Sequence, residues 1–260
     1  MTTAVEIDDL SFAYPGADRP ALERVSLMVP AGESVALLGA SGAGKTTLLA
    51  LLDGRLLAWR GRASVLGAPI DPDHPPSRDR RADSGFIFQE FALVERSTVL
   101  RNVLNGRLGR MPPLRAVLGA PTPSDLEVAR AALDDCGISD LADRRVDSLS
   151  GGQRQRVAIA RCLAQEPRLI LADEPVSNLD PARAAEILTL LTGVAGARGA
   201  TVLFSSHQPD LARRFAQRIV GMRGGRIVFD VPVAELNEDA TADLYRDGVS
   251  VSDVGLRAVT

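Results

Sequence analysis

The chain has 260 residues, of which 45% are hydrophobic and 24% charged, with 23 glycines and 16 prolines. This is enough for one large domain or two modest ones around a buried core, and it excludes a disordered or low-complexity chain. Basic and acidic residues nearly balance, at 30 and 33, so no strong field attracts nucleic acid or an anionic lipid surface.

The sequence shows no segment that would target the protein for secretion or anchor it in a membrane. The first residues contain no basic patch followed by a hydrophobic block, so we expect no secretion signal. No charge-free run approaches the roughly 20 apolar residues of a membrane-spanning helix. Cys136 and Cys162 are too few and too unpatterned for a disulfide framework or a zinc site. We therefore expect a soluble intracellular protein.

Short apolar segments of strand character recur along the chain with helical stretches between them. They are residues 5–10, 25–29, Ser34–Leu38, 85–88, Leu169–Ala172 and 201–204. Helical patterns follow some of them, at residues 45–52 and 182–191, and a hairpin is expected at 217–222 and 226–231 around Gly224 and Gly225. This alternation predicts an α/β fold with a mainly parallel sheet and helices on its faces.

The stretch from about residue 91 to 164 is poor in strand signals. Residues 124–127 read as a capping box for a helix that runs to about Cys136, and a second helix should begin near Gly152. We expect a helical insertion in the α/β core. Residues 71–83, rich in Pro, Arg and Asp, are expected to be a solvated loop.

A phosphate-binding loop follows the strand at Ser34–Leu38. The segment 39–46 fits G-x-x-x-x-G-K-[ST] between a predicted strand and a predicted helix. Glycines there let backbone N–H groups wrap phosphate oxygens, and the helix start adds partial positive charge. We expect Lys45 to reach the β- and γ-phosphates and Thr46 to offer its hydroxyl to Mg²⁺. The nucleotide-binding candidates are Gly39, Ser41, Gly42, Gly44, Lys45, Thr46 and Thr47. The alternative is a glycine-rich turn with a surface lysine.

Two adjacent carboxylates end the apolar strand at Leu169–Ala172. Successive residues leaving a strand point in different directions, so Asp173 and Glu174 can divide their work. We expect Asp173 to bind Mg²⁺, directly or through water, and Glu174 to polarise the attacking water. A solvated loop start is the alternative, but ligands of open α/β sheets bind at this carboxyl edge.

The pentapeptide Leu149-Ser-Gly-Gly-Gln153 precedes the acidic strand. Together with the phosphate loop and the Asp173-Glu174 strand end, it resembles the ATP-binding subunits of ABC transporters over roughly residues 4–230. The resemblance implies a P-loop NTPase fold, with a RecA-like, mainly parallel sheet core, an N-terminal antiparallel β subdomain and an inserted α-helical subdomain. It divides the chain into 1–88 with 165–230, the helical 89–164, and a tail at 231–260.

The resemblance also gives roles to single residues. In the family two subunits pack head to tail, so Ser150, Gly151, Gly152 and Gln153 of one copy would cap the ATP of the other. Ser150 can equally serve as a helix N-cap worth about 1 kcal/mol.

Four further positions match family motifs. Gln89 looks like the glutamine that touches Mg²⁺ or water, and Tyr14 like the aromatic residue that stacks on adenine, with Phe12 as its competitor. His207 matches the switch histidine beside Glu174 and the γ-phosphate. Asp180 resembles a residue of the loop that crosses the dimer interface, and with Pro181 after it, it also suits a helix N-cap.

The implied function is a homodimeric ATPase that drives integral-membrane permease subunits from the cytoplasmic face of the membrane and binds no nucleic acid. The segment 101–110 after Gln89 and the segment 172–177 are similar to phosphonate importer ATPases, and 236–245 is loosely so. A substrate-binding protein would take part indirectly. The candidates for permease contact are Phe91, Leu93, Val94 and Val99, for which ordinary core positions are the alternative. Residues 248–260 receive no role.

Three other interpretations stay open. The importer could carry phosphite, phosphate or amino acids instead. A soluble ABC ATPase of DNA repair or of the ribosome would need a coiled-coil insertion or a second nucleotide domain, and the sequence shows neither. A P-loop small-molecule kinase would not need the pentapeptide at 149–153.

Overall fold

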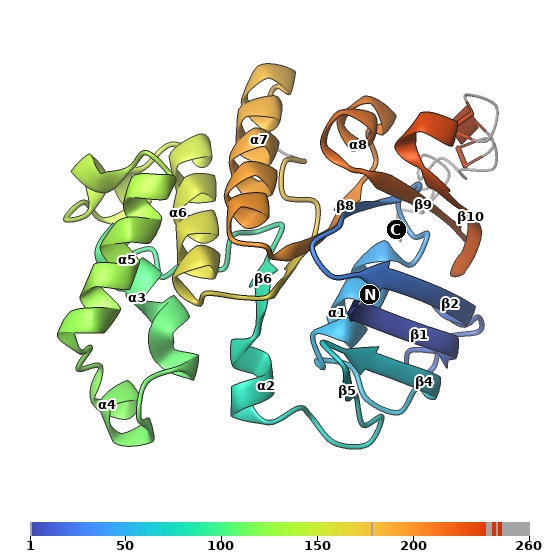
Figure 1. Cartoon of the computed structure of the whole chain (residues 1–260), viewed down its shortest axis with the longest axis horizontal. Coiled ribbons are helices and arrows are strands. Elements are labelled where there is room, and N and C mark those ends of the chain that lie inside the picture. The colour runs from blue at the N-terminus through green and yellow to red at the C-terminus, as the bar shows by residue number, and fades with distance from the viewer. Residues whose placement is uncertain (1, 178, 238–240, 243, 246–260) are drawn as a thin grey trace, which may run out of the picture.

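The computed structural model describes residues 2–177, 179–237, 241–242 and 244–245. Residues 248–260 and parts of the segment 236–245, which the sequence analysis mentions, lie outside the described residues. Figure 1 shows the antiparallel strands β1, β2 and β4 at the lower right of the molecule, β9 and β10 above them, and the helices α3 to α6 at the left.

The central sheet has six strands in the order β10-β9-β3-β8-β7-β6. Their bounds are β3 (Ser34–Leu38), β6 (Ser84–Ile87), β7 (Leu169–Ala172), β8 (Thr201–Ser206), β9 (Arg218–Arg223) and β10 (Arg226–Pro232). β6, β7, β8, β3 and β9 run parallel, and only β10 pairs antiparallel, with β9. The predicted α/β fold with a mainly parallel sheet is confirmed.

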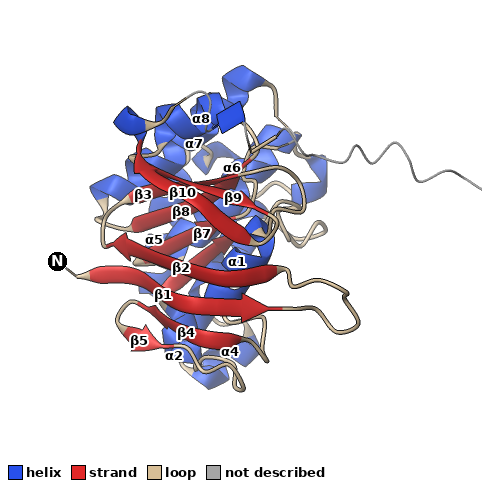
Figure 2. Cartoon of the chain, turned by 90° about the vertical axis from the view of Figure 1, so that its right-hand side faces the viewer, coloured by secondary structure: helices blue, strands red, loops and turns tan. Residues whose placement is uncertain are grey.

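A second sheet is fully antiparallel and has four strands in the order β2-β1-β4-β5. These are β1 (Thr3–Phe12), β2 (Leu22–Pro30), β4 (Arg60–Val65) and β5 (Ala68–Pro69). Figure 2 shows these strands below β3, β8, β9 and β10 of the central sheet, with helices behind them. The sequence analysis found shorter versions of β1 and β2 and missed β4, in which glycine and three polar residues obscure the alternation.

The helices are α1 (Lys45–Leu52), α2 (Arg78–Ala82), α3 (Val99–Leu104), α4 (Pro113–Leu118), α5 (Pro123–Asp135), α6 (Gly151–Ala164), α7 (Pro181–Ala197) and α8 (Pro209–Phe215), with short 3-10 turns at Asn105–Gly109, Ser139–Leu141, Val146–Ser148 and Val233–Glu235. The region between Phe91 and Ala164 contains helices and turns only, apart from an isolated bridge between Thr98 and Arg145. The expected helical insertion is therefore present.

Alternating side chains bury both faces of the central sheet. Leu37 of β3 and Leu171 of β7 pack with α1 and the antiparallel strands, whereas Leu38 and Ala172 pack with the helices of the insertion and α7. Burial on both faces explains why these strands read as continuous apolar runs. The sheet is thus a fixed platform whose edges present the connecting loops.

Two local predictions are wrong. The capping box of α5 is formed by Thr122 and Asp125, not by residues 124 and 127, because Pro123 occupies the first helical position and shifts the N-cap back. Residues 71–83 are not a continuous loop, because Ser77 caps the short helix α2. Val99, a candidate for permease contact with ordinary core as its alternative, is fully buried in the core, as that alternative predicts. Among the described residues no helix is both long and apolar enough to cross a membrane.

Candidate functional site

The parallel register gathers four loops at one edge of the central sheet. Leu38 pairs with Ser206, and Ala172 pairs with both Phe204 and Ile87, so these strands end level with one another. The loops that follow them carry the glycine-rich segment after β3, the two carboxylates after β7, Gln89 after β6 and His207 after β8. Residues far apart in sequence meet here because parallel strands share a carboxyl edge.

The loop before α1 leaves the start of that helix open. Gly44 is the N-cap of α1 at φ 103°, and no side chain caps the helix. A side chain at Gly44 would bring its Cβ to 2.8 Å from the carbonyl oxygen of Ala21, so only glycine fits there. The first-turn N–H groups have no partners within the helix, which makes this helix start suited to an anion.

Lys45 is held inside this loop. Its side chain is 5% exposed, and Nζ donates hydrogen bonds to the carbonyl oxygens of Gly39 at 2.7 Å and Ala40 at 3.0 Å. Nζ also lies 3.9 Å from Oε1 of Glu174. Burial lowers the pKa of Lys45, and the charges of Glu174 and Asp173 partly oppose that shift. A cation is therefore kept beside the open helix start.

Asp173 receives two hydroxyl groups on one oxygen. Thr46 Oγ1 donates to Asp173 Oδ1 at 3.0 Å, and Ser205 Oγ donates to the same atom at 2.8 Å. Ser205 also accepts a hydrogen bond from the backbone N–H of Glu174 at 2.8 Å. One buried serine thus fixes both carboxylate residues. The sequence analysis missed Ser205, although its place near the end of β8, two residues before His207, was a usable signal.

Glu174 lies between a lysine and a histidine. Its two carboxylate oxygens lie 3.9 Å from Lys45 Nζ and 3.4 Å from His207 Nδ1, and its side chain is 20% exposed. Its φ of 42° is in the left-handed region, which is rare for a residue with a long side chain and is found at functional sites. The carboxylate can accept a proton from a water molecule placed at this edge.

Lys45, Thr46 and Glu174 line one cavity of about 360 Å³, whereas Asp173 and His207 lie outside its lining. Tyr14, Gln89 and Glu174 line it together with Ala21 and residues 41–47. Tyr14 Oη lies 3.3 Å from Thr47 Oγ1, and its ring remains partly exposed. Phe12, the competing aromatic residue, is buried in the core and packs edge-on against Tyr14. Tyr14 is therefore the aromatic face available at this cavity.

The site also offers oxygen ligands for a magnesium ion. Thr46 and Asp173 present a hydroxyl and a carboxylate beside the open helix start. Mg²⁺ usually takes only one or two protein carboxylates and completes its shell with phosphate oxygens and water. Within the described residues no three His, Cys, Asp or Glu side chains gather as a metal cluster. The donor set therefore fits a magnesium ion held jointly by the protein and a nucleotide.

The pentapeptide at 149–153 does not line this cavity. Ser150 and Gln153 form a capping box at the start of α6, and Figure 1 shows α6 and α1 in separate parts of the molecule. Asp180 caps α7, where its side chain accepts a hydrogen bond from Arg183 N. The structure brings the loops after β3, β6, β7 and β8 together and leaves Ser150 and Asp180 outside that cluster.

The loop after Gln89 is tied to the helical region by two side chains that the sequence analysis missed. Arg161 of α6 donates to the carbonyl oxygens of Phe91, at 2.8 Å, and Ala92. Asn102 of α3, fully buried, exchanges two hydrogen bonds with the backbone of Val94. Movement of this loop must therefore move the helical insertion with it.

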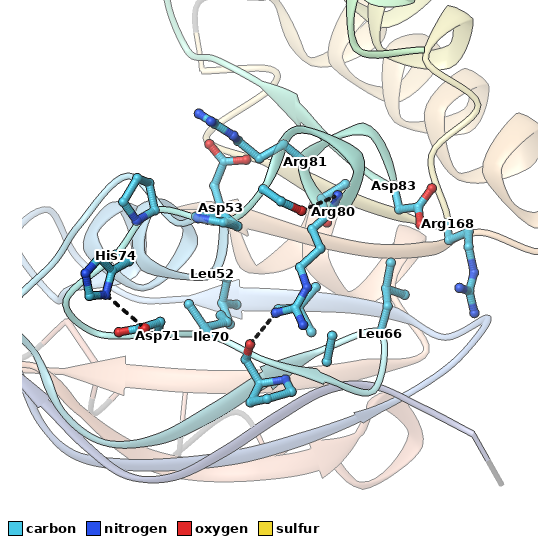
Figure 3. A pocket seen from close by; sticks show the side chains of 17 residues that line it. Leu52, Asp53, Leu66, Ile70, Asp71, His74, Arg80, Arg81, Asp83 and Arg168 are labelled. Atoms are coloured by element: carbon cyan, nitrogen blue, oxygen red, sulfur yellow. Dashed lines mark hydrogen bonds and ion pairs between the residues drawn. The ribbon is translucent and has the colours of Figure 1, made fainter.

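A second cavity, of about 460 Å³, lies near the amino ends of β6 and β7 (Figure 3). Arg80 donates to the carbonyl oxygen of Pro69, and Figure 3 shows Arg80, Arg81 and Arg168 extending in three different directions. Asp53 and Asp83 lie among them, so the arginines do not converge on one point. We assign no ligand to this cavity.

Comparison with known proteins identifies the family. Residues 22–177 match the family described as ABC transporter. The chain belongs to this family. As an ABC protein it is 43% identical over 251 residues to the "Phosphonates import ATP-binding protein PhnC" of Stutzerimonas stutzeri, which covers 94% of this chain and 90% of that protein.

Solved ABC proteins have the same fold. CbiO1 of Clostridium perfringens, part of the ABC transporter complex CbiONQ, superposes with a TM-score of 0.76 at 28% identity and covers 90% of each chain. A dimeric ATP-binding cassette bound to ADP and Pi has a TM-score of 0.75 at 30% identity and covers 88% of this chain and 98% of its own. This ABC protein is thus an ATP-binding cassette with ATPase activity.

Proposed function

We propose that this cassette hydrolyses ATP to energise the import of phosphonates across the cytoplasmic membrane. Phosphonates are proposed as the cargo because the chain is 43% identical, over nearly its whole length, to a relative named as a phosphonate import ATP-binding protein. The cassette itself would not touch the cargo, so its specificity comes from the permease and, indirectly, a substrate-binding protein.

ATP would bind in the cavity at the carboxyl edge of the sheet. The N–H groups of residues 39–47 and Lys45 Nζ would bind its phosphates, and the exposed face of Tyr14 would stack on adenine. Lys45 would exchange its two carbonyl acceptors for phosphate oxygens, which are stronger, charged acceptors. This exchange favours the nucleotide over the resting arrangement.

Thr46, Asp173 and Gln89 would hold Mg²⁺ beside the β- and γ-phosphates. When bound, the ion neutralises charge that develops on the transferred phosphoryl group. Ser205 keeps Asp173 in place through its hydrogen bond.

Hydrolysis would use Glu174 and His207. The carboxylate of Glu174 would accept a proton from the attacking water as the oxygen of that water bonds to the γ-phosphorus and the bond to the β-phosphate oxygen breaks. His207, 3.4 Å from Glu174, would orient that carboxylate and contact the γ-phosphate. The left-handed backbone of Glu174 aims its side chain at this point.

A second copy of the chain would complete each site. Ser150, Gly151, Gly152 and Gln153 of one copy would cap the triphosphate bound by its twin in a head-to-tail dimer, and Asp180 would lie at that interface. Two facts support this: the start of α6 is exposed and lies apart from the chain's own cavity, and a related cassette was solved as a dimer bound to ADP and Pi. Closure follows because ATP contacts both copies only in the closed state.

The dimer would act on integral-membrane permease subunits from the cytoplasmic face. The loop after Gln89 is the candidate contact, with Val94 half-exposed and Phe91 and Leu93 partly buried beside it. Arg161 and Asn102 tie that loop to the helical insertion, which gives a rigid path from the nucleotide to the permease.

Replacing Glu174 by glutamine tests the assigned base. We expect Glu174→Gln to lower ATP turnover about 100-fold or more, because general-base catalysis contributes roughly 10²–10⁴. ATP binding should persist, so gel filtration with ATP should show a trapped dimer. Glu127→Gln, at an exposed position of α5, is the matched control and should keep parental turnover. Parental turnover in Glu174→Gln would show that another group is the base.

The cargo is tested in cells. Deleting the gene should abolish growth on a phosphonate as the sole phosphorus source and leave growth on phosphate intact. Unchanged uptake of every phosphonate tested would reject this cargo and point to another solute, while leaving the ATPase assignment in place.

A further inference from the structure

The end of the described chain turns back onto the loop that carries His207. After β10 and the turn at Val233–Glu235, Thr241 Oγ1 donates to the carbonyl oxygen of Asn237 at 3.0 Å. Tyr245 N donates to the carbonyl oxygen of Ala242 at 3.1 Å, so this stretch is a hydrogen-bonded turn. We call residues 241, 242, 244 and 245 the tail turn.

The tail turn is anchored in the main core. Leu244 is 3% exposed and belongs to the same hydrophobic cluster as Leu211 and Ala212 of α8. Tyr245 packs against that cluster with its ring partly buried. Because Leu244 is buried and precedes Tyr245 directly, the packing of the core sets the position of the Tyr245 ring.

Tyr245 makes one polar contact across the molecule. Its Oη donates a hydrogen bond to the carbonyl oxygen of His207 at 3.1 Å, between residues 38 apart in sequence. Burial raises the pKa of Tyr245 to about 12, so the hydroxyl keeps its proton and stays a donor at neutral pH.

A second hydrogen bond, to the side chain of Ser206, holds the loop around His207. The N–H of Gln208 donates to Ser206 Oγ at 3.0 Å, which closes a short turn before α8. The imidazole of His207 extends from this turn with 45% of its surface exposed and reaches Glu174 Oε2 at 3.4 Å. The backbone carbonyl of His207 is thus the point where the tail turn acts on the histidine.

We propose that Tyr245 is a positioning residue for the ATPase site: its hydrogen bond fixes the peptide plane of His207 and thereby directs the imidazole toward Glu174. This rests on the role proposed for His207. The tail turn would then couple the carboxyl-terminal segment of the chain to the hydrolysis step without touching nucleotide.

The test is a double-mutant cycle in the full chain, with Tyr245→Phe, His207→Ala and the pair, assayed for turnover of Mg²⁺-ATP with radiolabelled phosphate so that slow rates are measured. Phenylalanine keeps the ring packing and removes only the hydroxyl. We expect Tyr245→Phe to lower kcat about threefold to tenfold, the range of one neutral hydrogen bond, with KM for ATP within about twofold. In the His207→Ala background the same change should alter turnover by less than about twofold, because the two residues act as one unit.

Thr241→Val is the matched control. It removes another hydrogen bond of the tail turn and keeps the side-chain shape, so kcat should stay near the parental value. Unchanged kcat in Tyr245→Phe, an equal loss in Thr241→Val, or the full loss persisting without His207 would each overturn the inference. If the parent itself turned over no ATP, the proposed function would fail and this inference with it, whereas an active parent with an inert Tyr245→Phe rejects the inference alone.

Discussion

Two glycine-rich helix starts in this protein look alike in sequence and differ in structure. The start of α1 has Gly44 at its N-cap with no side-chain cap, and Lys45 is buried beside it. The start of α6 has Ser150 and Gln153 closing their own capping box, and Ser150 and Gly151 are exposed. The first helix start has no side-chain cap, while in the second a capping box pairs the N–H groups of Ser150 and Gln153.

The difference teaches which half of an ATP site one chain can build. At α1 the loops after β3, β6, β7 and β8 converge, so one copy supplies the lysine, the carboxylates and the histidine. The start of α6 does not line that cavity. Beyond the neighbouring residues and the backbone of α6 itself, a Cβ at Gly151 or Gly152 would meet no atom of the described residues within 4 Å. The open space at the start of α6 is consistent with a surface that binds a second molecule.

The largest expected effect comes from the α1 side. Lys45→Ala removes the cation beside the phosphates, and we expect turnover to fall about 100-fold or more, as for other preorganised groups that stabilise charge in the transition state. Binding of a fluorescent ATP analogue should weaken in parallel. Arg24→Ala, which removes an exposed ion pair with Asp9, is the control and should change neither quantity. Retained binding and turnover in Lys45→Ala would break the comparison.

The α6 side can be tested with two matched caps. Ser150→Ala and Thr122→Ala each remove a capping box, from α6 and α5, and each should cost about 1 kcal/mol of stability. Only Ser150→Ala should also lower turnover, by about tenfold, because it alone would lose a hydrogen bond to a charged phosphate of the partner copy. ATP binding by dilute monomer should be unchanged. An equal effect of both variants on turnover would reduce Ser150 to a helix cap.

The smallest effect concerns the other end of α1. Asp53 follows that end, and burial raises the pKa of its carboxyl to about 6 from 3.8. The folded state then binds more protons than the unfolded state between these values, so the stability contributed by this group falls as the pH rises through 6. The cost at neutral pH is on the order of 2 to 3 kcal/mol at most. Asp53→Asn should therefore be more favourable, relative to the parent, at pH 7.5 than at pH 5 in urea unfolding.

Glu23→Gln is the control for that measurement. Glu23 is partly exposed, and a hydrogen bond from Arg226 lowers the pKa of its carboxyl. Its stabilising effect is present above the ordinary value of 4.5, so the difference between parent and variant should be nearly the same at pH 5 and pH 7.5. A pH trend in Asp53→Asn no larger than in Glu23→Gln would show that the burial of Asp53 does not affect stability.

Parts of this structure could be predicted from the sequence alone. The spans β3, α1 and β7 agree with prediction to the residue, because an apolar run buried on both faces, a glycine-rich turn and a motif leave little freedom. Asp180 and Pro181 begin α7 as their local chemistry requires. The roles of the site residues remain proposals, although the cavity does bring Tyr14 and Gln89 to the glycine-rich loop.

What the sequence determined by itself is local: the phosphate loop, the strand that ends in two acids, and the capped helix starts, since each depends on residues a few positions apart. The tertiary structure decided the rest. Ser205 holds Asp173 and Glu174 because β7 and β8 pair in register, Arg161 reaches the loop after Gln89 because α6 packs beside it, and Tyr245 meets His207 because the tail turn is buried on the core. Such contacts join residues distant in the chain, and no local pattern carries the register or packing that creates them.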